Sequence, residues 1–194
     1  MRALHVSDPK RSTEVREKTG SVEIDVAVSC ESWRLEIPDV AEMCRDAALA
    51  ALETAGPDLG GRDVEISLML GDDALIRGLN REYRNQDKAT NVLSFTSGDG
   101  GPESSTGPAT LGDAVIAFET VKSGAHAQGK SLEAHLAHMV VHGVLHLLGF
   151  DHKDPSRAEQ MEGLEISVLA GLGHDNPYAD GAACNTPSQP RGKL

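Results

Sequence analysis

The sequence predicts one α+β domain in which a small mixed sheet of about four strands is packed by helices. The chain has 194 residues, a length that suits a single domain. Hydrophobic residues make up 39% of the chain and 20 glycines add to its apolar content, so a packed core is possible. Apolar residues alternate in some segments and recur at helical spacing in others. These segments form neither a repeating βαβ series nor two separate blocks, which favours the α+β class.

The first half of the predicted domain contains two strands and two helices. Apolar residues alternate over 22–28, which predicts a strand with one buried face. Helical spacing follows over 38–55, with a proline near the start and a Gly-Pro pair just beyond the end. The alternation returns over 64–70. A second helix is predicted over 72–83, because two acidic residues at its start suit a helix N-terminus.

The second half predicts two further strands, over 91–95 and 111–118, separated by a Gly-rich loop over 98–110. A long helix over 131–148 and a final helix over 155–172 complete the domain.

Both ends of the chain are polar and lack periodicity, so we expect a flexible N-terminal tail over 1–20 and a flexible C-terminal tail over 175–194. A single catalytic domain is expected over 21–174. Three cysteines in no CxxC pattern argue against a disulfide framework. With no evident signal peptide or membrane span, we expect a cytoplasmic protein without a membrane partner.

The charge balance argues against broad binding to polyanions. Lys and Arg number 18 against 30 Asp and Glu, which gives a formal net charge of -12. A protein that coats nucleic acid or an anionic membrane by bulk charge is therefore disfavoured, although a local basic patch is still allowed. With only 1 Trp, 2 Tyr and 3 Phe, an extended base-stacking platform is also disfavoured.

A histidine motif carries the clearest chemistry. His142 and His146 are four residues apart in the long predicted helix, so their side chains lie on one face. Gly149 allows the helix to end in a left-handed turn, after which the chain can bring His152 back to the same point. Three neutral imidazoles bind one Zn²⁺ and leave a fourth position for water, the layout of a catalytic zinc site.

Histidines also occur upstream on nearly the same helical stripe. We expect His135 and His138 to be hydrogen-bonded residues of the core or part of a cleft wall, and not ligands. His126, His174 and His5 have no pattern around them and are expected at the surface.

The histidine spacing matches that of zinc proteases, but one catalytic group is missing. Those enzymes carry Glu after the first histidine as a general base, whereas this chain has Gly143. The metal layout therefore remains while the peptidase mechanism loses its base. Asp151 is the nearest carboxylate, and three roles stay open for it: a partner to a ligand imidazole, a general base, or a helix cap.

A basic segment lies inside this acidic chain. Over 77–88 four basic residues face two acidic ones, a local net charge of +2. The ordinary interpretation is a solvated helix face with ion pairs. The alternative is an anion site in which Arg84, at the end of the helix, binds phosphate oxygens through its planar guanidinium.

Four stretches together resemble the YbeY family of bacterial metal-dependent endoribonucleases: HGVLHLLGFDH, YRNQDKATNVLSF, LGDAVIA and EAHLAHMVVH. The resemblance runs from about 64 to 178. It implies a zincin-like fold, with the metal site on a long helix and the following turn. One Zn²⁺ would be bound by His142, His146 and His152, with a functional arginine at Arg84. It also implies cleavage of single-stranded RNA, in 3′-end maturation of small-subunit (16S) ribosomal RNA and in ribosome quality control.

Two other functions are carried alongside this one. A metallopeptidase fits the histidine spacing but not Gly143. A binding factor with a structural zinc would need a fourth protein ligand, for which Cys184 is the nearest cysteine in sequence. With a net charge of -12, the endoribonuclease is expected to engage RNA through a small site and to rely on ribosome or ribosomal-protein partners, with no DNA bound.

Overall fold

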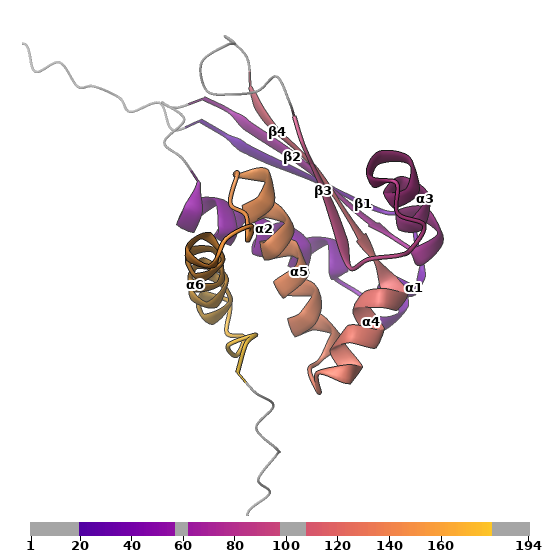
Figure 1. Ribbon diagram of the computed structural model, residues 1–194. Helices are drawn as coiled ribbons and strands as arrows, with labels where there is room; N and C mark the ends of the chain where they lie inside the picture. Colours follow the sequence, from indigo (N-terminus) through magenta and orange to yellow (C-terminus); the bar gives the residue numbers. More distant parts are fainter. Residues whose placement is uncertain (1–19, 57–61, 98–107, 180–194) are drawn as a thin grey trace, which may run out of the picture.

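The structure is a computed structural model that describes residues 20–56, 62–97 and 108–179 (Figure 1). The strands are β1 (Val22–Val28), β2 (Val64–Gly71), β3 (Val92–Thr96) and β4 (Ala109–Ala117). The helices are α1 (Ser32–Glu36), α2 (Val40–Ala55), α3 (Asp73–Arg84), α4 (Phe118–Ala127), α5 (Leu132–Leu147) and α6 (Pro155–Gly171).

The four strands form one mixed sheet in the order β1-β2-β4-β3. β1 and β4 each pair in parallel with β2, whereas β3 pairs antiparallel with β4 at the edge. The predicted class, an α+β domain with a small mixed sheet packed by helices, is confirmed. The closer likeness to zincins stays a prediction.

The two faces of the sheet carry different apolar cores. Ile66, Leu68 and Leu70 of β2 point into the main core, which α2, α5 and α6 cover (Figure 1). A smaller core on the opposite face joins Ile76 of α3 to Leu93 of β3, with Val115 and Ala117 of β4 beside them. The alternation along each strand therefore places α5 and α3 on opposite sides of β3 and β4.

Side-chain caps begin the helices at the residues that the sequence favours. Asp72 accepts a hydrogen bond from the backbone N–H of Leu75 at 2.8 Å and caps α3, as its acidic start predicted. Ser131 caps α5 in the same way, and Asp154 precedes the first-turn proline of α6. α3 ends at Asn85, whose φ of 55° is the left-handed conformation that stops a helix.

The limits of β4 and two helices differ from the prediction. β4 begins at Ala109 and ends at Ala117, so Phe118 starts the unpredicted helix α4 instead of ending a strand. The five-residue helix α1 was not predicted either, because it is too short to show a helical period. Residues 98–107 of the predicted loop and most of both predicted tails lie outside the described residues. Among the described helices, none is both long and apolar enough to span a bilayer.

Candidate metal centre

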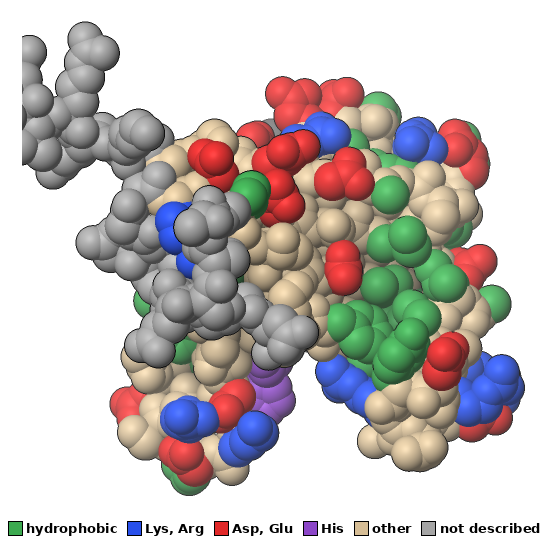
Figure 2. Space-filling view, turned by 90° about the horizontal axis from the view of Figure 1, so that it is seen from above, with side chains coloured by type: hydrophobic (Ala, Val, Ile, Leu, Met, Phe, Trp, Pro, Cys, Tyr) green, Lys and Arg blue, Asp and Glu red, His purple; other side chains and the backbone are tan. Residues whose placement is uncertain are grey.

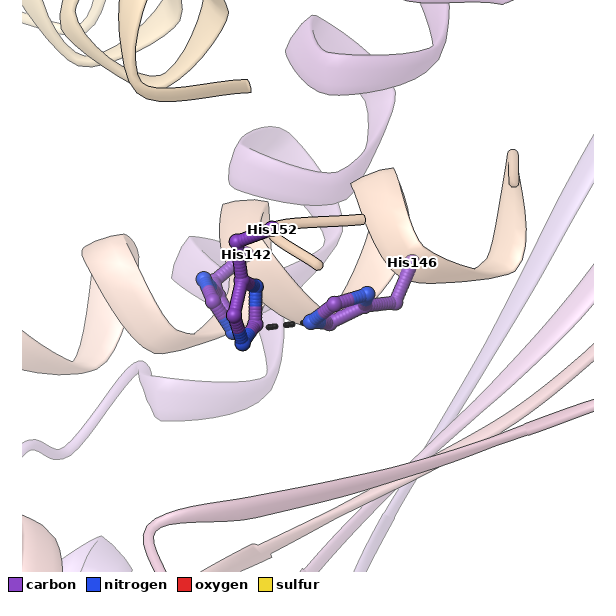
Figure 3. Close-up of side chains that lie close together, drawn as sticks. All are labelled: His142, His146 and His152. Atoms are coloured by element: carbon purple, nitrogen blue, oxygen red, sulfur yellow. Dashed lines mark hydrogen bonds between the residues drawn. The ribbon is translucent and has the colours of Figure 1, made fainter. Parts of the chain in front are cut away.

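The end of α5 brings three histidines together. His142 and His146 lie one turn apart, with their Nε2 atoms 3.0 Å from each other (Figure 3). The ring of His152 lies 5.6 Å from that of His142 and 5.1 Å from that of His146, measured between centroids. One ligand atom from each histidine falls within 4.8 Å of the other two. The predicted juxtaposition of these side chains is therefore present.

The turn that returns His152 to this point has a defined geometry. Gly149 has a φ of 90°, a conformation that side-chain-bearing residues rarely adopt. Its N–H donates to the carbonyl of His146, and the N–H of Phe150 donates to the carbonyl of Leu145, each at 3.0 Å. This pair of bonds is the Schellman ending of a helix, which reverses the chain direction within a few residues.

Hydrogen bonds fix the tautomers of two of these rings. His146 Nδ1 lies 2.9 Å from the carbonyl oxygen of Phe150, and His142 Nδ1 lies 2.7 Å from Glu165 Oε1. A carbonyl and a carboxylate only accept, so each Nδ1 carries the hydrogen. In the neutral rings each Nε2 is then a bare lone pair, and the two lone pairs face each other.

This arrangement fits a divalent metal ion. Two facing lone pairs repel unless a proton or a cation lies between them. Burial and the neighbouring His142 lower the pKa of His146, which disfavours the proton. Two imidazoles at about 2.0–2.1 Å from one tetrahedral Zn²⁺ have nitrogens about 3.3 Å apart, close to the separation seen here.

Glu165 completes this centre and was missed by the sequence analysis. The side chain is fully buried in α6 and contacts both His142 and His138, the latter through Nε2 at 3.1 Å. Burial raises the pKa of its carboxyl, but hydrogen bonds from His138, His142 and Tyr178 outweigh burial and hold the pKa at about 2. A glutamate four residues after the buried Met161, on the apolar stripe of α6, was the available signal.

The two upstream histidines, His138 and His135, differ in their hydrogen bonds. His138 is buried, is hydrogen-bonded and also lines the cleft described below, as predicted. It forms a second possible metal-binding group with His142 and Glu165, but His142 Nδ1 already donates to the carboxylate there. His135 is buried with neither ring nitrogen partnered among the described residues, contrary to the expected hydrogen bond. Burial, then His138 and Lys130, lower its pKa to about 4.

A cleft of about 650 Å³ joins the histidines to the predicted arginine. Arg84, at the last position of α3, is exposed and lines this cleft with the three histidines. Its Nη2 donates to the carbonyl of Ser94 at 3.4 Å, while the hydroxyl of Ser94 donates to the carbonyl of Gly143 at 3.0 Å. Figure 2 shows histidine in a notch between two lobes, with Lys, Arg and acidic side chains on the lobes beside it.

Asp151 lies beside the centre, but its carboxylate has other partners. It accepts from Arg157 Nη1 at 2.6 Å and from the N–H of Lys153 at 3.2 Å. The hydrogen bond from the N–H of Lys153 lowers the pKa of Asp151, and the charge of Arg157 lowers it further. Burial acts in the opposite direction but is outweighed. The N-cap of α6 is Asp154, so these contacts place Asp151 in the turn between α5 and α6 and not at a helix cap. The two chemical roles stay predictions.

Gly143 lies where α5 packs closely on the sheet. A Cβ at this position would lie 3.2 Å from Val92 Cγ2 and 3.4 Å from the Cβ of Ala114, so α5 rests closely on β3 and β4. A glutamate at this position would therefore point toward the sheet, and Val92 would have to shift to accommodate it. Cys184, the fourth ligand considered for a structural zinc, lies outside the described residues.

Comparisons with known proteins show which family this chain belongs to. The family model described as Endoribonuclease YbeY matches residues 27–173. Endoribonuclease YbeY of Paramagnetospirillum magneticum is 47% identical over 84% of this chain and 99% of that protein. The protein of the same name from Azorhizobium caulinodans is 51% identical over 81% and 97%. The solution structure of TM1509 from Thermotoga maritima has a TM-score of 0.49 and 20% identity, over 77% of this chain and 91% of that one. By the extent of these sequence matches, the chain belongs to the YbeY family.

Proposed function

We propose that this protein is a zinc-dependent endoribonuclease that cleaves single-stranded RNA. His142, His146 and His152 would hold one zinc ion, and Arg84 would bind the scissile phosphate. The observation that carries the proposal is the pair of facing Nε2 atoms, 3.0 Å apart, in a cleft that also contains Arg84. Membership of the YbeY family supports RNA cleavage as the reaction.

Different residues of the cleft would bind the metal, bind the phosphate and orient the metal ligands. When bound to the three histidines, zinc supplies Lewis-acid polarisation of a phosphoryl oxygen and a water of lowered pKa. Arg84 donates parallel hydrogen bonds to two phosphate oxygens and stabilises the charge that develops on them. Glu165 and the carbonyl of Phe150 keep the Nε2 atoms of His142 and His146 directed at the metal position.

The resemblance to the family further supports a role in 16S ribosomal RNA 3′-end maturation and ribosome quality control in the cytoplasm. The chain has a net charge of -12, and the basic residues described as lining its cleft are Arg84 and Lys153, so its own affinity for RNA should be weak. We therefore infer that ribosome-bound partners bring the substrate, and that DNA is not a substrate.

The two alternatives have less support. A peptidase needs a general base after the first histidine, and this chain has Gly143 there, packed closely against the sheet. A purely structural zinc needs a fourth protein ligand. Within the described residues, the group around His146 and His152 contains only three ligands.

The test compares the purified wild type with His146→Ala and Arg84→Ala for bound zinc and for cleavage of a single-stranded ribosomal RNA fragment. We expect His146→Ala to lose both metal and cleavage, and Arg84→Ala to keep metal and lose cleavage. His126→Ala and Arg81→Ala are matched controls on exposed helix positions and should retain both properties.

Equal cleavage by all five proteins would mean a contaminating nuclease and would overturn the assignment. Casein hydrolysis that disappears in His146→Ala would favour the peptidase instead. The products also identify the attacking group, because a 2′,3′-cyclic phosphate excludes direct attack by water at the cleavage step.

A further inference from the structure

The chain does not leave the domain at the end of α6. Residues 176–179 form a turn in which the N–H of Ala179 donates to the carbonyl of Asn176 at 3.2 Å. Pro177 occupies the second position, where proline is favoured, and the side chain of Asn176 accepts from the N–H of Tyr178 at 2.9 Å. The Asn-Pro-Tyr sequence thus holds Tyr178 in a defined direction.

This turn is fastened to the domain at two points, one of which is beside the metal centre. The ammonium group of Lys130 donates to the carbonyl of Pro177. The hydroxyl of Tyr178 donates to Glu165 Oε2, and its ring packs edge-on against His138 with 5.6 Å between centroids. Five residues of the segment predicted to be a tail, 175–179, are therefore described, and Tyr178 lines the cleft.

Three donors converge on one buried carboxylate. His138 and Tyr178 contact Glu165 Oε2, and His142 contacts Oε1. No arginine or lysine pairs with Glu165 in the part of the chain that the structure describes. A buried carboxylate needs all its hydrogen bonds to remain in one orientation, so loss of one donor affects the bonds made by the other oxygen.

We propose that Tyr178 and Glu165 are positioning residues: the C-terminal turn holds Glu165, and Glu165 holds the ring of His142 with Nε2 directed at the metal. This inference rests on the proposed function for the identity of the ligand set. The partner of a metal-ligating histidine typically changes metal affinity about 10–100-fold when removed. The effect of Tyr178, one bond further away, should be smaller.

The experiment measures the ring of His142 directly and metal binding separately. In the metal-free full-length protein, nitrogen NMR of His142 reports which ring nitrogen carries the hydrogen. Zinc affinity is measured by competition with a chromophoric chelator. We expect Glu165→Gln to mix the two tautomers and weaken zinc binding about 10–100-fold, and Tyr178→Phe to weaken it about 3–10-fold with a partial tautomer change.

Matched controls separate positioning from general loss of structure. Glu159→Gln lies exposed on the same helix, and Tyr83→Phe removes a hydroxyl from an exposed tyrosine of α3. Both should leave the tautomer and the zinc affinity unchanged. If Glu165→Gln does not fold, judged by circular dichroism, Tyr178→Phe still decides the question because it removes one atom from a partly exposed side chain.

An unchanged His142 tautomer together with unchanged zinc affinity in Tyr178→Phe would overturn the inference. Binding of two zinc ions per chain, reduced to one in Glu165→Gln, would also overturn it, because Glu165 would then be a ligand. If the wild type binds one zinc with the expected tautomer but does not cleave RNA, the proposed function fails and the positioning role stands.

Discussion

The two walls of the cleft are built in different ways. The helical wall, formed by α5, α6 and the turn over 148–152, carries the three histidines. Two of these rings have partners 2.7 and 2.9 Å away, and one of the partners, Glu165, is fully buried. The strand wall, formed by α3 and β3, carries Arg84, which is exposed and makes one hydrogen bond of 3.4 Å within the protein.

This difference separates two requirements of the proposed reaction. Metal ligands must be directed before the ion arrives, because each misdirected ring weakens binding. A phosphate-binding arginine instead gains its strong partners from the substrate and needs freedom to reach them. The helical wall is therefore expected to respond to mutation in metal content and stability, and the strand wall in activity alone.

Removal of the metal should have the largest effect and tests the helical wall. Dialysis against a chelator should abolish RNA cleavage without changing the circular dichroism spectrum, because the apolar core holds α5 in place. Returning zinc at a thousandfold excess over its dissociation constant should raise the free energy of unfolding by about 4 kcal/mol. Loss of helical signal on dialysis would show that the wall is not formed without metal.

Arg84→Ala should have the next largest effect and tests the strand wall. We expect kcat on single-stranded RNA to fall about 100–1000-fold, because a charge-stabilising donor is lost from the transition state. Arg84→Lys should recover only part of this rate, since an ammonium group cannot bind two oxygens in parallel. Zinc content and melting temperature should stay at the wild-type values, and a fall in zinc content would contradict the separation of the two walls.

Gly143→Glu tests the boundary between the walls. The substitution restores the sequence motif of the peptidases, but it places a carboxylate between α5 and the sheet. We expect a loss of about 3–5 kcal/mol in the free energy of unfolding, measured by urea denaturation, because an unpaired charge is buried. A stable variant that hydrolyses casein would show that the sheet can move away from α5.

Acid should weaken the helical wall through His135. Its pKa of about 4 lies below the ordinary value, so the folded state favours the neutral ring. This contribution is complete above about pH 6.5 and is lost as the pH falls toward 4, at a cost of about 2–3 kcal/mol. Metal-free His135→Leu should therefore lose less stability than the metal-free wild type between pH 7 and pH 4. Parallel pH profiles would show that the pKa of His135 in the folded protein is not lowered.

The smallest effect is expected in the strand wall. Arg77 Nε and Nη2 donate to the two oxygens of Asp87, at 2.7 and 2.9 Å, and this pair joins α3 to the loop that follows Arg84. Both side chains are exposed, so Asp87→Asn should change the melting temperature by at most about 2 °C. A larger change, seen by differential scanning fluorimetry, would mean that the strand wall is as rigidly held as the helical wall.

The sequence was informative where local rules decide the structure. The helical spacing of His142 and His146 and the left-handed turn at Gly149 follow from residues within one or two turns of each other, and both are present. The helix start at Asp72 follows from the same kind of rule, whereas the cap of α6 lies at Asp154 and not at Asp151. The metal and the roles of Arg84 and Asp151 stay predictions.

The sequence was uninformative where partners are far apart in the chain. Glu165 lies 23 residues from His142, and only the packing of α6 on α5 brings them together. Tyr178 appeared to belong to a polar tail, because nothing near it in sequence indicates its contact with Glu165. The helix α4 was missed for a related reason: it follows β4 without any intervening turn residue, so the strand pattern appeared to continue.

Ser94 links the two walls of the cleft through its hydrogen bonds. Its hydroxyl is bonded to the main chain of α5, and its carbonyl accepts from Arg84. Thermal displacement of β3 against α5 is therefore restrained by the bond from Ser94, while Arg84, held by one long bond, keeps its freedom to reach the phosphate. Ser94→Ala would release this restraint, and the distribution of Arg84-to-metal distances would broaden even if their average did not change.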